Sequence, residues 1–296
     1  MITRRHFVVG GSAAAAFPGI LKPALAKEVP VAIDCHAHVF TRALPMVGDR
    51  RYAPDYDADI ATYLAMLDAN GSTHGVLIQP SFLGTDNSYL LEALARAPDR
   101  LRGVAVLSPE TSLDQLTAMA AKGIVGVRLN LIGKEDPPLA EPLWRRHLAD
   151  LAGLGWQVEV QVEAHRLPTL LPVLLDAGPV VVLDHFGKPS PDLGVTDPGF
   201  QTLLAAGRTG RVWVKVSAPY RNGPNGLAIA AAAIPLLKDH LGLDHLVWGS
   251  DWPHTQFESS TSPQQCRRYL DDWFPDAAER AIVLGRTPAQ LFKVLL

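Results

Sequence analysis

Cysteine is scarce in this chain of 296 residues, in which only Cys35 and Cys266 occur. Two cysteines cannot supply the disulfide framework that holds small secreted domains together, so we expect a hydrophobic core to stabilise the fold. An excess of one charge is absent as well, because the formal net charge is −3. Neither nucleic acid nor an anionic membrane surface is therefore an expected partner, and a small molecule is the better expectation.

Two motifs with well-defined chemistry are also missing. No glycine-rich phosphate loop follows the first expected strand, which argues against a dinucleotide-binding open sheet. No Gly-x-Ser-x-Gly sequence occurs, which argues against a serine nucleophile. Beyond the N-terminal region, no run of residues is long and apolar enough to cross a bilayer.

The N-terminal residues read as an export signal. Arg4 and Arg5 precede an uncharged, alanine-rich run, and an A-x-A cleavage site ends at Ala26. This order is typical of a twin-arginine signal peptide, which directs folded proteins across the inner membrane. We disfavour a buried N-terminal helix, because the run is short and weakly apolar. We therefore expect residues 1–26 to be removed and residues 27–296 to form a single periplasmic domain without stable membrane association.

Short runs rich in β-branched residues alternate with longer helical patterns along the rest of the chain, as in parallel βα units. The expected strands are residues 31–36, 75–79, 103–107, 125–129, 157–162, 180–184, 212–216 and 246–249. The expected helices are residues 58–67, 88–97, 113–121, 142–154, 167–177 and 227–241. This pattern matches a (β/α)8 TIM barrel in number and size, with an open doubly wound sheet as the alternative.

Polar residues follow almost every expected strand at the point where it ends. The first strand ends in His36 and His38, which are two residues apart and so point to one side of a strand. His185 follows the sixth strand and Asp251 follows the last. Because catalytic residues of a barrel lie at the C-terminal ends of its strands, we expect these four side chains to meet at the barrel mouth.

A cluster of three histidines and one aspartate is open to two chemical interpretations. His36, His38, His185 and Asp251 could together hold one divalent metal, for which zinc is the natural choice with imidazole ligands. The histidines could equally polarise a substrate carbonyl by hydrogen bonds alone, while Asp251 takes a proton from water. A purely structural role, such as a helix cap for Asp251, is the less favoured interpretation of each residue.

Two arginines indicate the charge of the substrate. Arg128 ends the fourth expected strand and Arg221 follows the seventh. Guanidinium groups bind carboxylates in a bidentate way, so we expect an acidic small molecule. Ser81, in a loop after the second strand, is a further candidate for substrate binding, whereas Lys134 reads as an ordinary surface residue.

Seven segments together resemble the amidohydrolase superfamily, most closely the branch that includes 2-pyrone-4,6-dicarboxylate lactonase and related sugar lactonases. These segments run in order through almost the whole mature chain and are residues 34–40, 79–87, 126–130, 184–189, 215–221, 248–254 and 286–292. The resemblance implies a distorted (β/α)8 barrel and a hydrolase whose nucleophile is water. It further implies site roles for seven residues: His36, His38 and His185 polarise the lactone carbonyl, Asp251 activates water, and Ser81, Arg128 and Arg221 hold carboxylates.

The resemblance has departures that bear on substrate and cofactor. Where the dicarboxylate lactonase is expected to carry a second arginine and a tyrosine, this chain has Lys134 and Gln161. The lysine on strand four and the histidine ending strand five that two-metal members use are absent too. We therefore expect either no cofactor or a single divalent ion.

The sequence thus predicts a hydrolase of a carboxylated lactone or related cyclic ester, and a homo-oligomer is compatible with it. Two alternatives stay open. One is a metal-dependent, non-oxidative decarboxylase on the same barrel. The other is a periplasmic protein that binds small acids without catalysis.

Overall fold

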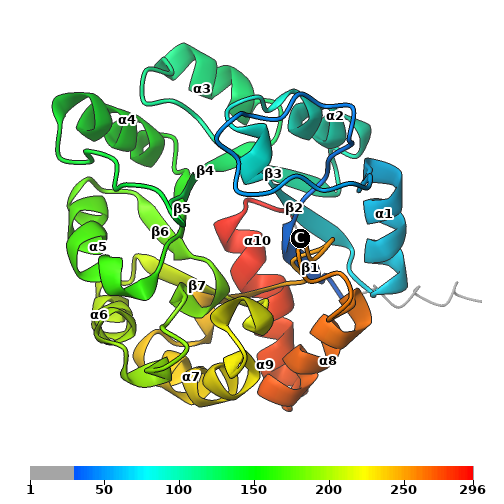
Figure 1. Cartoon of the computed structure of the whole chain (residues 1–296), viewed down its shortest axis with the longest axis vertical. Helices are drawn as coiled ribbons and strands as arrows, with labels where there is room; N and C mark the ends of the chain where they lie inside the picture. The colour runs from blue at the N-terminus through cyan, green and yellow to red at the C-terminus, as the bar shows by residue number, and fades with distance from the viewer. Residues whose placement is uncertain (1–29, 296) are drawn as a thin grey trace, which may run out of the picture.

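The computed structural model describes residues 30–295, which form a (β/α)8 barrel (Figure 1). The expected export signal lies outside the described residues. Eight parallel strands follow one another around the sheet. They are β1 (Ile33–Ala37), β2 (His74–Ile78), β3 (Leu101–Ala105), β4 (Ile124–Asn130), β5 (Gln157–Gln161), β6 (Val180–Leu183), β7 (Val212–Ser217) and β8 (Leu246–Gly249). Each begins and ends within two residues of an expected strand, so the predicted fold class is confirmed.

Helices surround the strands on the outside of the barrel, except for α10, which lies over its centre (Figure 1). They are α1 (Ile60–Ala69), α2 (Ser88–Arg96), α3 (Leu113–Ala120), α4 (Pro142–Gly153), α5 (Leu167–Asp176), α6 (Pro198–Ala206), α7 (Gly226–His240), α8 (Pro263–Trp273), α9 (Ala277–Ala281) and α10 (Thr287–Leu291). No helix among these is long and apolar enough to cross a membrane.

Helices α6, α8 and α9 were not among the expected helices. Helix α6 opens with Pro198 and Gly199, and glycine is a poor helix former. The structure explains both residues. Proline is tolerated in the first turn of a helix, and the Asp197 side chain caps this one by accepting a hydrogen bond from Gly199 N at 2.7 Å. A Cβ on Gly199 would lie only 1.7 Å from the Ala164 carbonyl oxygen, so close packing requires glycine there.

The barrel closes where the segment after β8 runs beside β1. Asp251 N donates to the His36 carbonyl oxygen at 2.8 Å, and His38 N donates to the Trp252 carbonyl oxygen at 2.8 Å. Gly249 permits this approach, because a Cβ there would lie 2.6 Å from the His36 Cβ. The closure therefore places Asp251 beside the two histidines that end β1.

The C-terminal segment covers the end of the barrel at which the strands begin. In Figure 1, α10 of this segment lies across the centre of the barrel. Phe292 and Val294 pack with apolar side chains of the strands, among them Ile33 of β1 and Val247 of β8. A Cβ on Gly285 would lie 2.9 Å from the Val31 carbonyl oxygen, just before β1 begins, so this segment covers the N-terminal ends of the strands. The C-terminal ends are left for a site.

Candidate active site

A cavity of about 190 Å³ lies at the C-terminal ends of the strands, and we call it the mouth cavity. Its lining residues are His38, Arg51, Tyr52, Ser81, Arg128, Asn130, Ile132, Gln161, His185, Lys188, Arg221, Asp251, Thr255, Gln256 and Phe257. They include every predicted site residue except His36, which is fully buried next to the cavity. A larger cavity of about 860 Å³, lined in part by α2 and β3, contains none of the predicted site residues.

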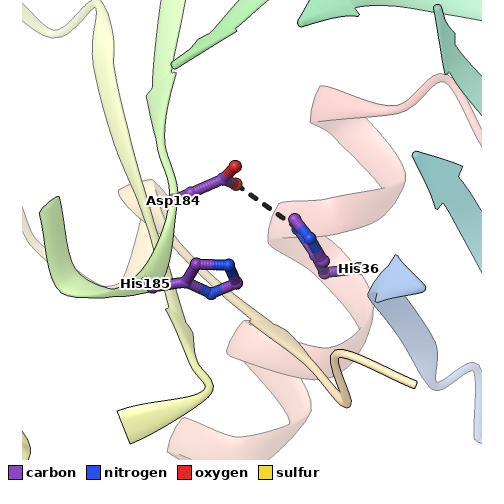
Figure 2. A group of neighbouring side chains, drawn as sticks. All are labelled: His36, Asp184 and His185. Atoms are coloured by element: carbon purple, nitrogen blue, oxygen red, sulfur yellow. Dashed lines mark ion pairs between the residues drawn. The ribbon is translucent and has the colours of Figure 1, made fainter. Parts of the chain in front are cut away.

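The four predicted catalytic side chains lie together. The rings of His36 and His38 are 5.0 Å apart and nearly perpendicular, and those of His36 and His185 are 4.7 Å apart. The Asp251 Oδ1 atom lies 3.7 Å from His36 Nε2 and 3.9 Å from His185 Nε2. Figure 2 shows His36, at the end of β1, facing His185 and Asp184, which follow β6. The structure therefore joins residues separated by more than two hundred positions in one cluster.

Two of these residues have an uncommon backbone conformation. Asp251 has φ 60° and His185 has φ 51°, in the left-handed region that few residues other than glycine adopt. Such conformations cost energy and concentrate at functional sites, where surrounding contacts hold them in place. In both residues the turn directs the side chain into the cluster directly after the strand has ended.

Hydrogen bonds fix how His38 and His185 present their rings. His38 Nδ1 lies 2.7 Å from the Ile78 carbonyl oxygen, which only accepts, so Nδ1 carries the proton and Nε2 is unprotonated. His185 Nδ1 lies 2.9 Å from Ser217 Oγ. Burial, followed by the Arg128 charge, lowers the pKa of His38 to about 4, and burial lowers the pKa of His185 to about 3. Both rings are therefore neutral near pH 7.

His36 is held differently, by two groups at one nitrogen. Lys215 Nζ, which is a donor, lies 3.1 Å from His36 Nδ1, and Asp184 Oδ1, which is an acceptor when ionised, lies 3.3 Å from the same atom (Figure 2). Burial and the Lys215 charge lower the pKa of His36 well below its usual range. The Nε2 atom has no hydrogen-bond partner among the described residues. His36 therefore presents a free Nε2 atom to the cluster, 3.7 Å from Asp251 Oδ1.

Lys215 belongs to a fully buried charge network below the mouth cavity, which we call the interior network. Its members are Glu159 on β5, Asp184 after β6, Lys215 on β7 and Arg128 on β4. Lys215 Nζ lies 2.5 Å from Glu159 Oε2, and Arg128 Nη2 donates to Asp184 Oδ2 at 2.8 Å. Burial and the Asp184 charge raise the pKa of Glu159 to about 8, although Lys215 and Arg128 act in the opposite direction.

Asp251 is oriented through one of its two oxygens. Oδ2 accepts hydrogen bonds from Arg221 Nε and from the Tyr220 hydroxyl, both at 2.6 Å. Burial alone would raise the pKa of Asp251, but Arg221 and the nearby histidines hold it well below its usual range. Oδ1 has no hydrogen-bond partner in the described part of the chain and faces the imidazoles. The carboxylate is therefore anionic, fixed and open on one side.

We predict that Tyr220→Phe lowers kcat about tenfold and leaves KM nearly unchanged, because the hydroxyl positions Asp251 and contacts a charged oxygen. Steady-state kinetics with the best substrate measures both constants. Tyr269→Phe on α8 is the matched control, since the Tyr269 ring stacks on Trp273 and does not line the mouth cavity. A Tyr220→Phe enzyme with unchanged kcat would contradict the positioning role.

The cluster has the spacing of a site for one divalent ion. The nitrogen and oxygen atoms that His36, His38 and Asp251 offer lie within 4.8 Å of one another, as do those of His36, Asp184 and His185. Four ligands at zinc distances would be roughly 3.4 Å apart, slightly closer than the separations observed here. His36 Nε2, His185 Nε2 and Asp251 Oδ1 are buried without partners among residues 30–295, as open ligand atoms would be.

The cationic residues are distributed differently from the sequence-based expectation. Arg128 and Arg221 line the mouth cavity, as predicted, but each is already paired with a carboxylate. Lys134 pairs with Asp49 at 3.3 Å and lies outside the cavity lining. Arg51 and Lys188, which sequence reasoning missed, line it instead. Arg51 could have been singled out in the sequence, because it directly precedes the aromatic Tyr52 in the loop after the His-x-His strand.

Comparison with known proteins agrees with this geometry. The family model described as Amidohydrolase matches residues 33–294. The chain is 30% identical over 272 residues to 4-sulfomuconolactone hydrolase of Hydrogenophaga intermedia, covering 89% of each chain. It is 32% identical over 239 residues to 2-pyrone-4,6-dicarboxylate hydrolase of Comamonas testosteroni, covering 75% of this chain and 77% of that protein.

Among solved structures, a probable 2-pyrone-4,6-dicarboxylic acid hydrolase of Acinetobacter baumannii with bound citric acid superimposes with a TM-score of 0.86 at 41% identity. The match covers 88% of this chain and 99% of that one. Sequence and barrel topology thus point in one direction: the chain belongs to the amidohydrolase family, in the branch of the 2-pyrone-4,6-dicarboxylate hydrolases.

Proposed function

We propose that the protein hydrolyses a lactone, or a related cyclic ester, that carries at least one carboxylate. The observation that supports this most strongly is the open Oδ1 atom of Asp251, which faces the imidazoles of His36 and His185 in a cavity lined by arginines. A fixed carboxylate opposite neutral imidazoles suits the attack of water on a carbonyl group. The names of the relatives, which describe a sulfonated lactone and a dicarboxylate lactone, support the same substrate class.

The substrate carboxylate binds at the basic side of the mouth cavity. Arg221 is held by Asp251 and by the Thr255 carbonyl oxygen, which accepts from Nη2 at 3.3 Å. Arg128 is oriented by Asp184 and by Gln161, whose Oε1 accepts from Nη2 at 2.8 Å. These contacts hold both guanidinium groups rigid, so little entropy is lost when they bind an anion. Ser81 adds a hydroxyl to the same wall.

Hydrolysis then follows from the positions of Asp251 and the histidines. Water near Oδ1 gives a proton to Asp251 as its oxygen forms a bond to the lactone carbonyl carbon. The carbonyl oxygen gains negative charge, which N–H groups at the free Nε2 atoms of His36 and His185 stabilise. The ring C–O bond breaks, Asp251 returns its proton to the leaving oxygen, and the product is an open-chain acid.

The residues also fit a single divalent ion, which His36, His38, His185 and Asp251 would hold. When bound, such an ion would polarise the lactone carbonyl as a Lewis acid.

A pH-indicator assay over a panel of neutral and carboxylated lactones tests the proposed function, with elemental analysis of the same protein. We expect acid release from carboxylated lactones and little from neutral ones. Carbon dioxide release from aromatic acids by metal-containing protein would instead indicate a decarboxylase. Tight binding of acids without turnover would indicate a binding protein.

We also propose that the protein works in the periplasm after export by the twin-arginine route. Arg4, Arg5 and the cleavage site ending at Ala26 support this proposal. A reporter fused after Ala26 should be exported, and export should be lost when Arg4 and Arg5 are both replaced by lysine. Undiminished export of that variant would contradict the proposal.

A further inference from the structure

A buried carboxylate that the proposed mechanism does not use lies on β1, next to the catalytic cluster. Asp34 is only 1% exposed. Within residues 30–295 it accepts hydrogen bonds from neutral groups, which are the main-chain N–H groups of His36 and Ser250 and the hydroxyl groups of Ser250 and Tyr63. A carboxylate is costly to bury without a cation, so stability alone does not explain Asp34. The bonds that it accepts show what it holds in place.

A bulge in β1 directs Asp34 away from the interior of the barrel. Residues two apart in a regular strand point to one side, but β1 carries one extra residue after Asp34 relative to β2. The Tyr63 hydroxyl of helix α1, outside the strands, therefore lies 3.4 Å from Asp34 Oδ2. His36, by contrast, contacts Lys215 inside the barrel. Gly75, opposite Asp34 on β2, leaves room for the tyrosine, because a Cβ there would overlap its hydroxyl oxygen.

Asp34 binds two donors of Ser250, the residue before Asp251. Oδ1 accepts from Ser250 N at 2.7 Å, and Oδ2 accepts from Ser250 Oγ at 2.6 Å. This two-point contact fixes the main chain and the side chain of Ser250 together. Ser250 Oγ in turn accepts from Trp252 N at 3.1 Å. The residues on both sides of Asp251 are therefore connected to one carboxylate on β1.

This connection holds the turn that carries Asp251. Asp251 has φ 60°, a conformation that residues other than glycine keep only where surrounding contacts impose it. Asp34 Oδ1 also lies 3.3 Å from His36 N, and the His36 carbonyl oxygen accepts from Asp251 N at 2.8 Å. Asp34 thus contacts the chain on both sides of the closure between β1 and the segment after β8. The separation of 3.7 Å between Asp251 Oδ1 and His36 Nε2 depends on that closure.

A different pair of residues orients the Asp251 side chain. Arg221 and Tyr220, in the segment after β7, bond to its Oδ2 atom and fix the rotation of the carboxylate. Asp34 and Ser250 act on the main chain of the same turn. The catalytic carboxylate is therefore held at both ends, by its oxygen and by its backbone.

We infer that Asp34 and Ser250 are positioning residues for the reaction, which hold the Asp251 backbone in the conformation that directs Oδ1 toward His36. This inference rests on the proposed function. Both residues are buried and neither lines the mouth cavity, so they do not touch the substrate. Their loss should lower kcat and leave KM nearly unchanged, because a small displacement of a reacting group slows the chemical step without removing the groups that bind the substrate.

Ser250→Ala is the mildest test, because it removes the hydroxyl and keeps the main-chain bond to Asp34. We expect kcat to fall about tenfold and KM to stay within about twofold of wild type. Asp34→Asn places an amide donor at Oδ2, which now accepts two hydrogen bonds, and should lower kcat at least as much. The double variant should lose little more than the larger single loss, because both substitutions break one connection. Steady-state kinetics with the best carboxylated lactone measures these constants.

Asp197→Asn is the matched control for a loss of stability. Asp197 is buried too and accepts from Gly199 N at 2.7 Å and from Ser190 N at 2.8 Å, but it does not line the mouth cavity. Its kcat should equal that of wild type under conditions in which urea denaturation shows all variants to be folded. The inference is overturned if Ser250→Ala keeps the wild-type kcat, if its KM rises instead, or if Asp197→Asn lowers kcat equally. If Asp34→Asn does not fold, the result for Ser250→Ala decides.

Amide hydrogen exchange of the intact protein distinguishes this inference from the proposed function, because it needs no substrate. If wild type hydrolyses no lactone, the proposed function fails, but the turn after β8 can still be followed. We expect faster exchange within residues 250–254 in Ser250→Ala and wild-type exchange there in Asp197→Asn. Equal exchange of that segment in wild type and Ser250→Ala, or an increase spread evenly over the barrel, would reject the inference.

Discussion

Asp251→Asn should lower kcat by a factor on the order of 10² or more and leave substrate affinity largely intact. The asparagine keeps the shape of the side chain and can still accept from Arg221 and Tyr220, which now bond to Oδ2 at 2.6 Å. It cannot accept a proton at the position of Oδ1, which faces His36 and His185. Single-turnover kinetics and a binding measurement on the same protein separate the two effects.

Asp86→Asn is the matched control for that substitution. Asp86 also follows a strand, but its carboxylate accepts from Ser88 N at 3.1 Å and does not line the mouth cavity. Its kinetics should equal those of wild type. Near-normal turnover by Asp251→Asn would mean that another group activates the water.

Lys215→Met should lower the free energy of unfolding by about 3–5 kcal/mol, because it leaves a buried carboxylate without its cation. Lys215 and Glu159 are fully buried, and Nζ lies 2.5 Å from Oε2. Burial and the Asp184 charge raise the pKa of Glu159 to about 8, so the full loss is expected above that pH, where Glu159 is ionised in wild type. Urea denaturation of wild type and variant measures the difference.

Two further variants show whether this cost comes from the buried pair. The double variant Lys215→Met with Glu159→Gln should be more stable than Lys215→Met alone, because the unpaired charge is removed. Arg286→Met breaks a pair of similar length with Asp244, 2.6 Å, whose side chains are more than 60% exposed, and should cost less than about 1 kcal/mol. Equal losses of unfolding free energy in Lys215→Met and Arg286→Met would contradict the claim that the buried Lys215–Glu159 pair stabilises the fold more than an exposed pair does.

The strands were predictable because a barrel strand is buried on both faces and so consists largely of β-branched and apolar residues. The run Val180–Leu183 of β6 is the clearest example. The ends of the strands could be predicted as well, since a polar residue after such a run marks the barrel mouth. This is why His36, His185 and Asp251 were found before any distance was known.

The interior network was not predictable from the sequence in the same way. Glu159 lies between Val158 and Val160, and Lys215 lies between Val214 and Val216, so each is a single charge inside an apolar strand. Only the register of the sheet shows that the two charges, on strands separated by β6, meet inside the barrel at 2.5 Å. Sequence spacing carries no information on that register.

The position of Arg51 depends on the path of a loop. Between β1 and α1 the chain is fixed by tertiary contacts, such as the hydrogen bond from Phe40 N to the Ala58 carbonyl oxygen at 2.8 Å. Loops of this kind have no periodic pattern from which the direction of a side chain could be inferred. The sequence therefore indicated that cations would bind the substrate but not which cations reach the cavity.

The most direct test of the proposed chemistry is hydrolysis of a carboxylated lactone in water labelled with heavy oxygen, followed by analysis of the new carboxylate in the product. Attack of Asp251-activated water on the lactone carbonyl predicts one labelled oxygen in that carboxylate after a single turnover. A new carboxylate without label, or a product that is a rearranged lactone, would contradict it.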